Sequence, residues 1–222
     1  MEKIFQGVHR FRTHVFPGQR ALFEALESAQ RPEVLFITCS DSRIDPALIT
    51  QMQPGELFVL RNAGNIVPPY GQGSGAEAAT IEFAVRQVRV RHIIVCGHSQ
   101  CAAMQRAVES PESDDFPALR AWLVHAQATR QIVQSKYSAL DPGPRLNAAI
   151  QINVLVQLGH LHTHPAVAEA LAEGRLQLHG WVYRIGSGQI FQYNAANARF
   201  EEITDTSRPM PVSRLLLPEA FV

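Results

Sequence analysis

Short, mostly apolar runs alternate along the chain with segments that have helical periodicity. The runs at 34–37, 57–60 and 92–96 predict buried strands, because each is short and is bounded by polar, proline or glycine positions. Two later runs, 176–184 and 189–193, flank the tripeptide Gly186-Ser187-Gly188 and predict a β-hairpin.

Between these runs, apolar residues recur at steps of three and four. Phe5, Val8, Phe11 and Val15 predict an N-terminal helix, which Pro17-Gly18 interrupts before a second helix at 21–29. The same periodicity predicts helices at 76–88, 102–108, 119–137, 145–160 and 166–172. Strands that alternate with helices over 222 residues predict one α/β domain, with a central, mainly parallel sheet wrapped by helices.

The composition narrows the range of partners. Lys and Arg together number 20, as do Asp and Glu, so the formal net charge is zero and the basic face that nucleic acid or an anionic membrane requires is not indicated. No apolar segment approaches the roughly 18 residues of a membrane span. The start of the chain lacks the apolar run of a secretory signal, and three cysteines do not indicate a disulfide framework. We therefore expect a cytoplasmic protein whose thiols are packed, reactive or metal-bound.

Metal-ligating residue types follow two of the predicted strands. Cys39 comes after the run 34–37, and His98 and Cys101 come after the run 92–96. Functional residues of a parallel sheet lie just past the carboxyl ends of its strands, so these side chains are candidates for one site. Two thiolates and one imidazole suit zinc, and three protein ligands with one open position are typical of a catalytic site.

A carboxylate and a guanidinium stand beside the first cysteine. Asp41 could be a fourth metal ligand, or it could accept a hydrogen bond from bound water while Arg43 holds it. The residues alone are compatible with both an open and a closed site. Cys96, inside its strand, is expected to be a core residue, and His160, His162 and His164 are expected at a solvated helix end.

Several motifs together resemble one enzyme family. Residues 39–43, Cys-Ser-Asp-Ser-Arg, and residues 97–101, Gly-His-Ser-Gln-Cys, resemble the paired signature of the β-class carbonic anhydrases. The segments 55–65, 67–70 and 178–183 match further family stretches in the same order, so the resemblance runs from about residue 5 to residue 193. The sequence of residues 36–51 is most similar to the cyanobacterial and plant-like branch of this family.

The resemblance implies an activity and a set of site residues. The activity is the reversible, zinc-dependent hydration of carbon dioxide to bicarbonate and a proton. A hydrolase for carbonyl sulfide or carbon disulfide on the same scaffold is an alternative, and so is a non-catalytic, zinc-stabilised oligomer in which Asp41 closes the site. By family position, the zinc ligands are Cys39, His98 and Cys101, the ion pair is Asp41 with Arg43, the substrate-orienting amide is Gln30, the aromatic cleft residues are Phe58 and Phe83, and Ala102 replaces the usual glycine.

The resemblance also implies an architecture. Four parallel strands and one added antiparallel strand form the sheet of a single domain. Residues 1–30 form a helical dimerisation arm, 34–193 the catalytic core and 194–222 a C-terminal tail. Family members are homodimers or dimers of dimers, so Gln30 is expected to reach the cleft of the neighbouring chain.

Overall fold

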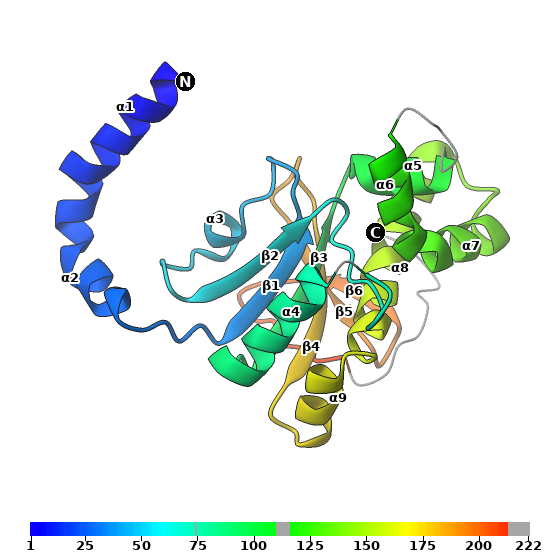
Figure 1. Ribbon diagram of the computed structural model, residues 1–222. Helices are drawn as coiled ribbons and strands as arrows, with labels where there is room; N and C mark the ends of the chain where they lie inside the picture. The colour runs from blue at the N-terminus through cyan, green and yellow to red at the C-terminus, as the bar shows by residue number, and fades with distance from the viewer. Residues whose placement is uncertain (74, 110–115, 213–222) are drawn as a thin grey trace. The chain divides into compact units, whose positions relative to one another are not determined.

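The computed structural model describes residues 1–73, 75–109 and 116–212 (Figure 1). The chain divides into two compact units, Met1–Arg31 and Pro32–Val222. The first unit is helical, and the second holds the sheet and its covering helices. Among the described residues, no helix combines the length and the apolar character needed to cross a membrane.

The N-terminal unit is one continuous helix in three parts: α1 (Glu2–Arg10), the π-helical η1 (Phe11–Val15) and α2 (Phe16–Glu27). The predicted interruption at Pro17-Gly18 is therefore wrong. The Phe16 N–H bonds to the Phe11 carbonyl, five residues back, and this wide turn directly before Pro17 relieves the clash that a proline ring makes inside a regular α-helix. None of the side chains of these three segments is buried.

The sheet has six strands in the order β2-β1-β3-β4-β5-β6. Neighbouring pairs among β1 (Val34–Cys39), β2 (Leu57–Asn62), β3 (His92–His98) and β4 (Gln177–Tyr183) are parallel, whereas β5 (Ile190–Asn194) and β6 (Arg199–Glu202) extend the sheet in antiparallel fashion (Figure 1). The expected fold class and the hairpin are confirmed. Strand β6 was not predicted, because three of its four residues are charged and Phe200 alone is apolar and buried.

Most predicted helices are present in the second unit. The expected helix at 119–137 is broken by a 3₁₀ turn, and the short helix α3 was not predicted. A side-chain cap explains α3, because the Leu48 N–H donates to Asp45 Oδ1 at 3.1 Å and Pro46 occupies the first helical position. The helices are α3 (Pro46–Thr50), α4 (Ala76–Glu82), the π-helical η2 (Phe83–Val88), α5 (Ala102–Glu109), α6 (Pro117–Leu123), the 3₁₀ turn η3 (Val124–Ala126), α7 (Gln127–Lys136), α8 (Pro142–Leu161) and α9 (Pro165–Ala172).

The long helix α8 packs directly on β3 and β4 in the largest core cluster. Two glycines allow this close approach. A Cβ at Gly97 would lie 3.0 Å from Val154 Cγ2, and a Cβ at Gly180 would lie 2.9 Å from Val154 Cγ1. The backbone of α8 is thereby brought close to the carboxyl end of β3, where the candidate ligands lie.

The expected solvated histidines at the end of α8 are a partial error. His162 is exposed, but His164 is buried and His160 is half-buried. His160 Nδ1 bonds to the Val67 carbonyl at 2.8 Å, and His164 Nε2 bonds to the Pro68 carbonyl at 3.0 Å. The two rings therefore fasten the loop after β2 to the end of α8, and burial lowers the pKa of both histidines.

Candidate metal centre

The structure brings Cys39, His98 and Cys101 together. β1 and β3 are adjacent parallel strands, with Thr38 opposite Cys96, so their carboxyl ends present Cys39 and His98 at the same edge of the sheet. Cys101 follows the turn that leads into α5. The ligand atoms of the three side chains all lie within 4.8 Å of one another, and all three residues are buried.

The orientation of the His98 ring fits a metal ligand. Its Nδ1 lies 2.9 Å from the Ser99 carbonyl, which can only accept, so Nδ1 carries the proton. Nε2 is then an acceptor, and it is buried without a hydrogen-bond partner among the residues that the structure describes. Leaving such an atom without a partner is costly, and a cation bound by Nε2 and the two sulfurs removes the cost.

The two sulfurs share one environment. The Gly64 N–H donates to Cys39 Sγ at 3.3 Å. The contact with Cys101 and the hydrogen bond from the Gly64 N–H lower the pKa of the Cys39 thiol, while the same contact with Cys39, together with burial, raises the pKa of Cys101. A divalent cation between the sulfurs would displace the proton that they share. Cys96 is also buried, and desolvation raises its pKa, so it is the core residue expected from the sequence.

Asp41 is held by Arg43 through both of its carboxylate oxygens. Arg43 Nε donates to Oδ1 at 2.9 Å, Nη2 donates to Oδ2 at 2.7 Å, and the backbone N–H of Arg43 also donates to Oδ1 at 2.9 Å. These contacts hold the pKa of the Asp41 carboxyl well below its usual range. Asp41 Oδ2 lies 3.9 Å from His98 Nε2, so the carboxylate is beside the ligand cluster but is paired with Arg43.

Arg61 is a site-building residue that sequence reasoning missed. From the end of β2, its guanidinium donates to the carbonyls of Cys39 at 3.0 Å, Asp41 at 2.7 Å and Ile44 at 2.9 Å. These bonds fix the backbone that carries both Cys39 and Asp41. The role depends on the register that places Thr38 opposite Arg61, which a single sequence does not reveal.

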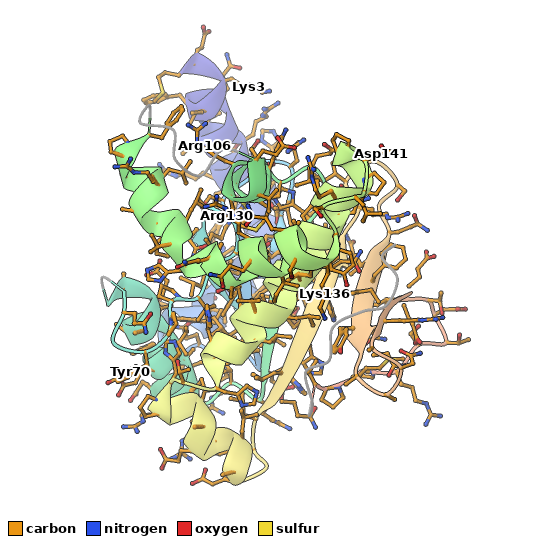
Figure 2. All side chains as sticks on the ribbon, turned by 90° about the vertical axis from the view of Figure 1, so that its right-hand side faces the viewer. Lys3, Tyr70, Arg106, Arg130, Lys136 and Asp141 are labelled. Carbon is orange, nitrogen blue, oxygen red and sulfur yellow. The ribbon has the colours of Figure 1, made fainter. Side chains whose placement is uncertain are left out.

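A cleft of about 630 Å³ opens beside the cluster, between the end of β1 and helices α5 and α6. Cys39, Asp41 and Ala102 line it, together with Arg106 and Phe116. The guanidinium of Arg106, labelled in Figure 2, lies 4.3 Å from the centre of the Phe116 ring. Ala102 therefore lines the same cleft as the candidate ligand Cys39.

Phe58 and Phe83 are not among the residues that line this cleft. Phe58 and Phe83 contact each other, with ring centroids 6.0 Å apart. Phe58 precedes Asn62, the partner of Cys39, by four residues on the same strand, which corresponds to about 13 Å. Gln30 belongs to the N-terminal unit, beyond the end of α2.

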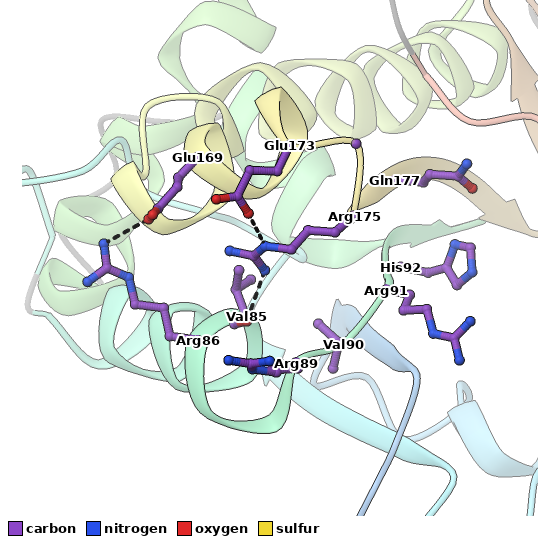
Figure 3. Close-up of a pocket in the computed structure, with 11 residues that line it drawn as sticks. Val85, Arg86, Arg89, Val90, Arg91, His92, Glu169, Glu173, Arg175 and Gln177 are labelled. Atoms are coloured by element: carbon purple, nitrogen blue, oxygen red, sulfur yellow. Dashed lines mark hydrogen bonds and ion pairs between the residues drawn. The ribbon is translucent and has the colours of Figure 1, made fainter.

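A larger hollow of about 900 Å³ lies at the opposite end of the sheet, where β3 and β4 begin (Figure 3). It is rich in arginine, but carboxylates balance much of that charge. Arg86 pairs with Glu169 at 3.3 Å, and Arg175 pairs with Glu173 and also donates to the Val85 carbonyl (Figure 3). We interpret these contacts as an ion-pair network that ties η2 to α9.

The fold and the cluster define a class of protein: an α/β protein with a Cys-His-Cys metal-binding group at the carboxyl edge of a parallel sheet. A family model described as "Carbonic anhydrase" matches residues 34–190. The chain belongs to the carbonic anhydrase family, and within it to the β class, as the sequence motifs indicated. The expectation that it is an enzyme, a carbonic anhydrase, is likewise confirmed.

Relatives and solved structures support this assignment over nearly the whole chain. A carbonic anhydrase of Synechococcus elongatus is 43% identical over 96% of this chain and 79% of its own length. One from Pseudomonas aeruginosa is 46% identical over 92% of this chain and 93% of its own. The structure of the β-carbonic anhydrase CcaA superimposes with a TM-score of 0.91 at 42% identity, covering 95% of both chains. A tetrameric β-carbonic anhydrase of Sordaria macrospora gives 0.79 at 32% identity, covering 86% of this chain and 95% of its own.

Proposed function

We propose that this chain catalyses the reversible hydration of carbon dioxide to bicarbonate and a proton, with zinc bound by Cys39, His98 and Cys101. The observation that carries the proposal is the buried cluster of two sulfurs and an imidazole whose Nε2 has no partner among the described residues. Such a donor set suits zinc. A bound zinc ion supplies a Lewis acid that activates water.

Asp41 and Arg43 keep the fourth metal position open. Because Arg43 occupies both carboxylate oxygens, Asp41 is drawn away from the ligand cluster. The same pairing keeps Asp41 ionised, so it accepts a hydrogen bond from a water molecule in the cleft and orients it. This geometry favours an open, catalytic site over the non-catalytic alternative in which Asp41 closes the site.

The aromatic and amide residues of the cleft are proposed to come from a second copy of the chain. β2 is an edge strand, and Val59 on it and Phe83 nearby are 42% and 48% exposed. Unpaired strand edges and exposed apolar side chains favour association. We propose that Gln30, Phe58 and Phe83 complete the cleft of a partner subunit.

The N-terminal unit is the proposed dimerisation arm. Phe5 is 70% exposed, and Ile4 and Val8 are also exposed on the same helix. A helix with an uncovered apolar face gains stability by burying that face against another chain. A homodimer or a dimer of dimers agrees with the tetrameric relative of Sordaria macrospora. The division into arm 1–30, core 34–193 and tail 194–222 and the cytoplasmic location stay predictions.

Carbon dioxide is proposed as the substrate in preference to carbonyl sulfide or carbon disulfide. The relatives that are 43% and 46% identical both carry the name carbonic anhydrase. Ala102 stands where the family usually has glycine, and like glycine it has a backbone N–H. We propose that this N–H faces the substrate.

A stopped-flow assay of carbon dioxide hydration, with zinc quantified per chain, tests the proposal. Wild-type protein is expected to be active with about one zinc per chain. Cys101→Ser is expected to lose zinc and activity, because a hydroxyl is a poor substitute for a thiolate. Cys96→Ser is the matched control, since that buried thiol lies outside the ligand cluster. Full zinc content in Cys101→Ser, or loss of zinc in Cys96→Ser alone, contradicts the ligand assignment.

A further inference from the structure

The peptide group that joins Ala63 to Gly64 is hydrogen-bonded at both ends. Its carbonyl, on Ala63, accepts from Trp122 Nε1 at 2.8 Å. Its N–H, on Gly64, donates to Cys39 Sγ at 3.3 Å. An indole on α6 is therefore connected to a candidate metal ligand on β1 through a single planar peptide.

We infer that Trp122 is a positioning residue for the metal site, which acts on the Cys39 sulfur through the Ala63–Gly64 peptide. The inference rests on the proposed metal site. Among the described residues, the indole N–H of Trp122 donates to the Ala63 carbonyl and not to a ligand side chain. Its effect is to hold the donor of the N–H···S hydrogen bond in place and to polarise it.

The conformation of the peptide makes such an anchor necessary. Gly64 has a φ of +85°, in the left-handed region, and lies in a loop rather than in the sheet. The following carbonyl, that of Gly64, accepts from Asn153 Nδ2 on α8 at 3.0 Å. Trp122 and Asn153 thus clamp the two consecutive peptides on either side of the Gly64 Cα.

Rigidity and polarisation carry the effect to the sulfur. A trans peptide is planar, so fixing its oxygen restricts the direction of its N–H. A hydrogen bond to the carbonyl also strengthens the bond that the N–H donates, because successive hydrogen bonds polarise one another. An N–H···S bond stabilises charge on the sulfur, which lowers the energy of its donor electrons and orients the sulfur toward the cation.

The chain contains two tryptophans, and the second is a matched control. Trp181 is also partly buried, and its ring packs against Phe36 with centroids 6.0 Å apart. Its Nε1 has no hydrogen-bond partner among the described residues. Trp122→Phe and Trp181→Phe therefore both remove an indole N–H from a packed ring, but only the first removes one that is bonded.

Cobalt(II) substitution of the full-length protein tests the inference without relying on turnover. The readouts are the energy of the thiolate-to-cobalt charge-transfer band and the cobalt affinity, measured by competition with a chelator. For Trp122→Phe we expect the band to move to lower energy and the affinity to fall about tenfold, at the low end of outer-shell effects. For Trp181→Phe we expect both readouts to equal those of the wild type.

Three outcomes are decisive. A Trp122→Phe protein with unchanged band and affinity overturns the inference, even when its apoprotein is less stable, because packing alone does not change the thiolate donor. Equal changes in both tryptophan variants also overturn it. A wild type that binds cobalt without a thiolate band instead refutes the proposed metal site itself.

A closer isostere covers the case in which Trp122→Phe fails to fold. Benzothienylalanine at position 122 keeps the two-ring shape and replaces only the N–H by sulfur. The same shift of the band and the same loss of affinity are expected. A band and an affinity equal to those of the wild type overturn the inference.

Discussion

The replacement of Gly64 by alanine probes the tightest part of the metal-site loop. Gly64 has a φ of +85°, and a Cβ there would lie 2.9 Å from Met104 Cε and 3.2 Å from Ala103 Cβ. Met104 Cε is the flexible end of a buried side chain, whereas Ala103 is on the first turn of α5 and has little room to move. Gly71 has nearly the same φ, +81°, but nothing lies within 4 Å of its added Cβ.

The two substitutions therefore separate backbone strain from contact. A non-glycine residue in the left-handed region costs about 1–2 kcal/mol, offset in part by about 0.4–1 kcal/mol because alanine restricts the unfolded chain. We expect Gly71→Ala to destabilise the protein by about 1 kcal/mol on these grounds. Gly64→Ala adds the overpacking term, roughly 1–2 kcal/mol where one neighbour is a flexible methionine end, for a total of about 2.5 kcal/mol.

Thermal unfolding at matched protein concentration measures the difference. For a chain of this size, about 1 kcal/mol corresponds to roughly 2–4 °C, so Tm is expected to fall about 5–10 °C for Gly64→Ala and about 2–4 °C for Gly71→Ala. Gly64→Ala should also bind metal more weakly, because relief of the Cβ contacts displaces the residue-64 N–H that donates to Cys39 Sγ. Equal Tm losses in the two variants would refute the close packing around Gly64.

Three other predictions concern the proposed roles of single residues. Gln30→Ala should keep its zinc but lose carbon dioxide hydration about 10²-fold, as when a transition-state hydrogen-bond donor is removed. If Gln30 acts in the cleft of the partner, heterodimers of Gln30→Ala and Cys101→Ser chains should regain activity. No recovery of activity, when subunit exchange is proven, counts against a shared cleft. Arg43→Ala should release Asp41 to become the fourth metal ligand and so lower activity even at alkaline pH, and a crystal structure with Asp41 still turned away from the metal contradicts this. Burial lowers the pKa of His179 to about 4. In the unfolded chain the pKa of histidine is near 6.5. Between about pH 6.5 and pH 4 the unfolded chain therefore binds a proton at His179 that the folded protein does not bind, and the free energy of unfolding falls, by about 2 kcal/mol at pH 5. Urea unfolding at neutral and acidic pH should show a smaller loss for His179→Gln, and an equal loss in both proteins would rule out this residue as the cause.

The parts of the structure that could be predicted are those with a local signal. Apolar runs located the four parallel strands and the hairpin strand β5, and ligand-type residues directly after two of the runs indicated a shared site, because parallel strands end at one edge. The Asp41–Arg43 pair was equally local, since the two residues are two positions apart. In each case the relevant partners are close in sequence or are linked by strand pairing.

The parts that could not be predicted depend on contacts between distant elements. Pro17 does not end the N-terminal helix, because a π turn accommodates the proline ring. A π turn has no sequence motif by which it could be predicted. The histidines after residue 159 looked solvated because the acceptors of His160 and His164 are carbonyls of a loop more than 90 positions away. Strand β6 has one apolar residue and is stabilised by its pairing with β5.

The same reasoning explains why the support of the metal site is hidden in the sequence. Arg61 acts on carbonyl oxygens, and Trp122 acts on the carbonyl of Ala63, so neither bond depends on the side chain of its acceptor. A backbone acceptor leaves no residue type to search for at the far end of the contact. The ligands of such a site can be found as a motif, whereas the residues that hold the ligands become visible only when the register of the sheet and the packing of α6 and α8 are known. Substitutions in this supporting layer should therefore change metal binding without altering any recognisable motif, which is what the comparison of the two tryptophans is designed to detect.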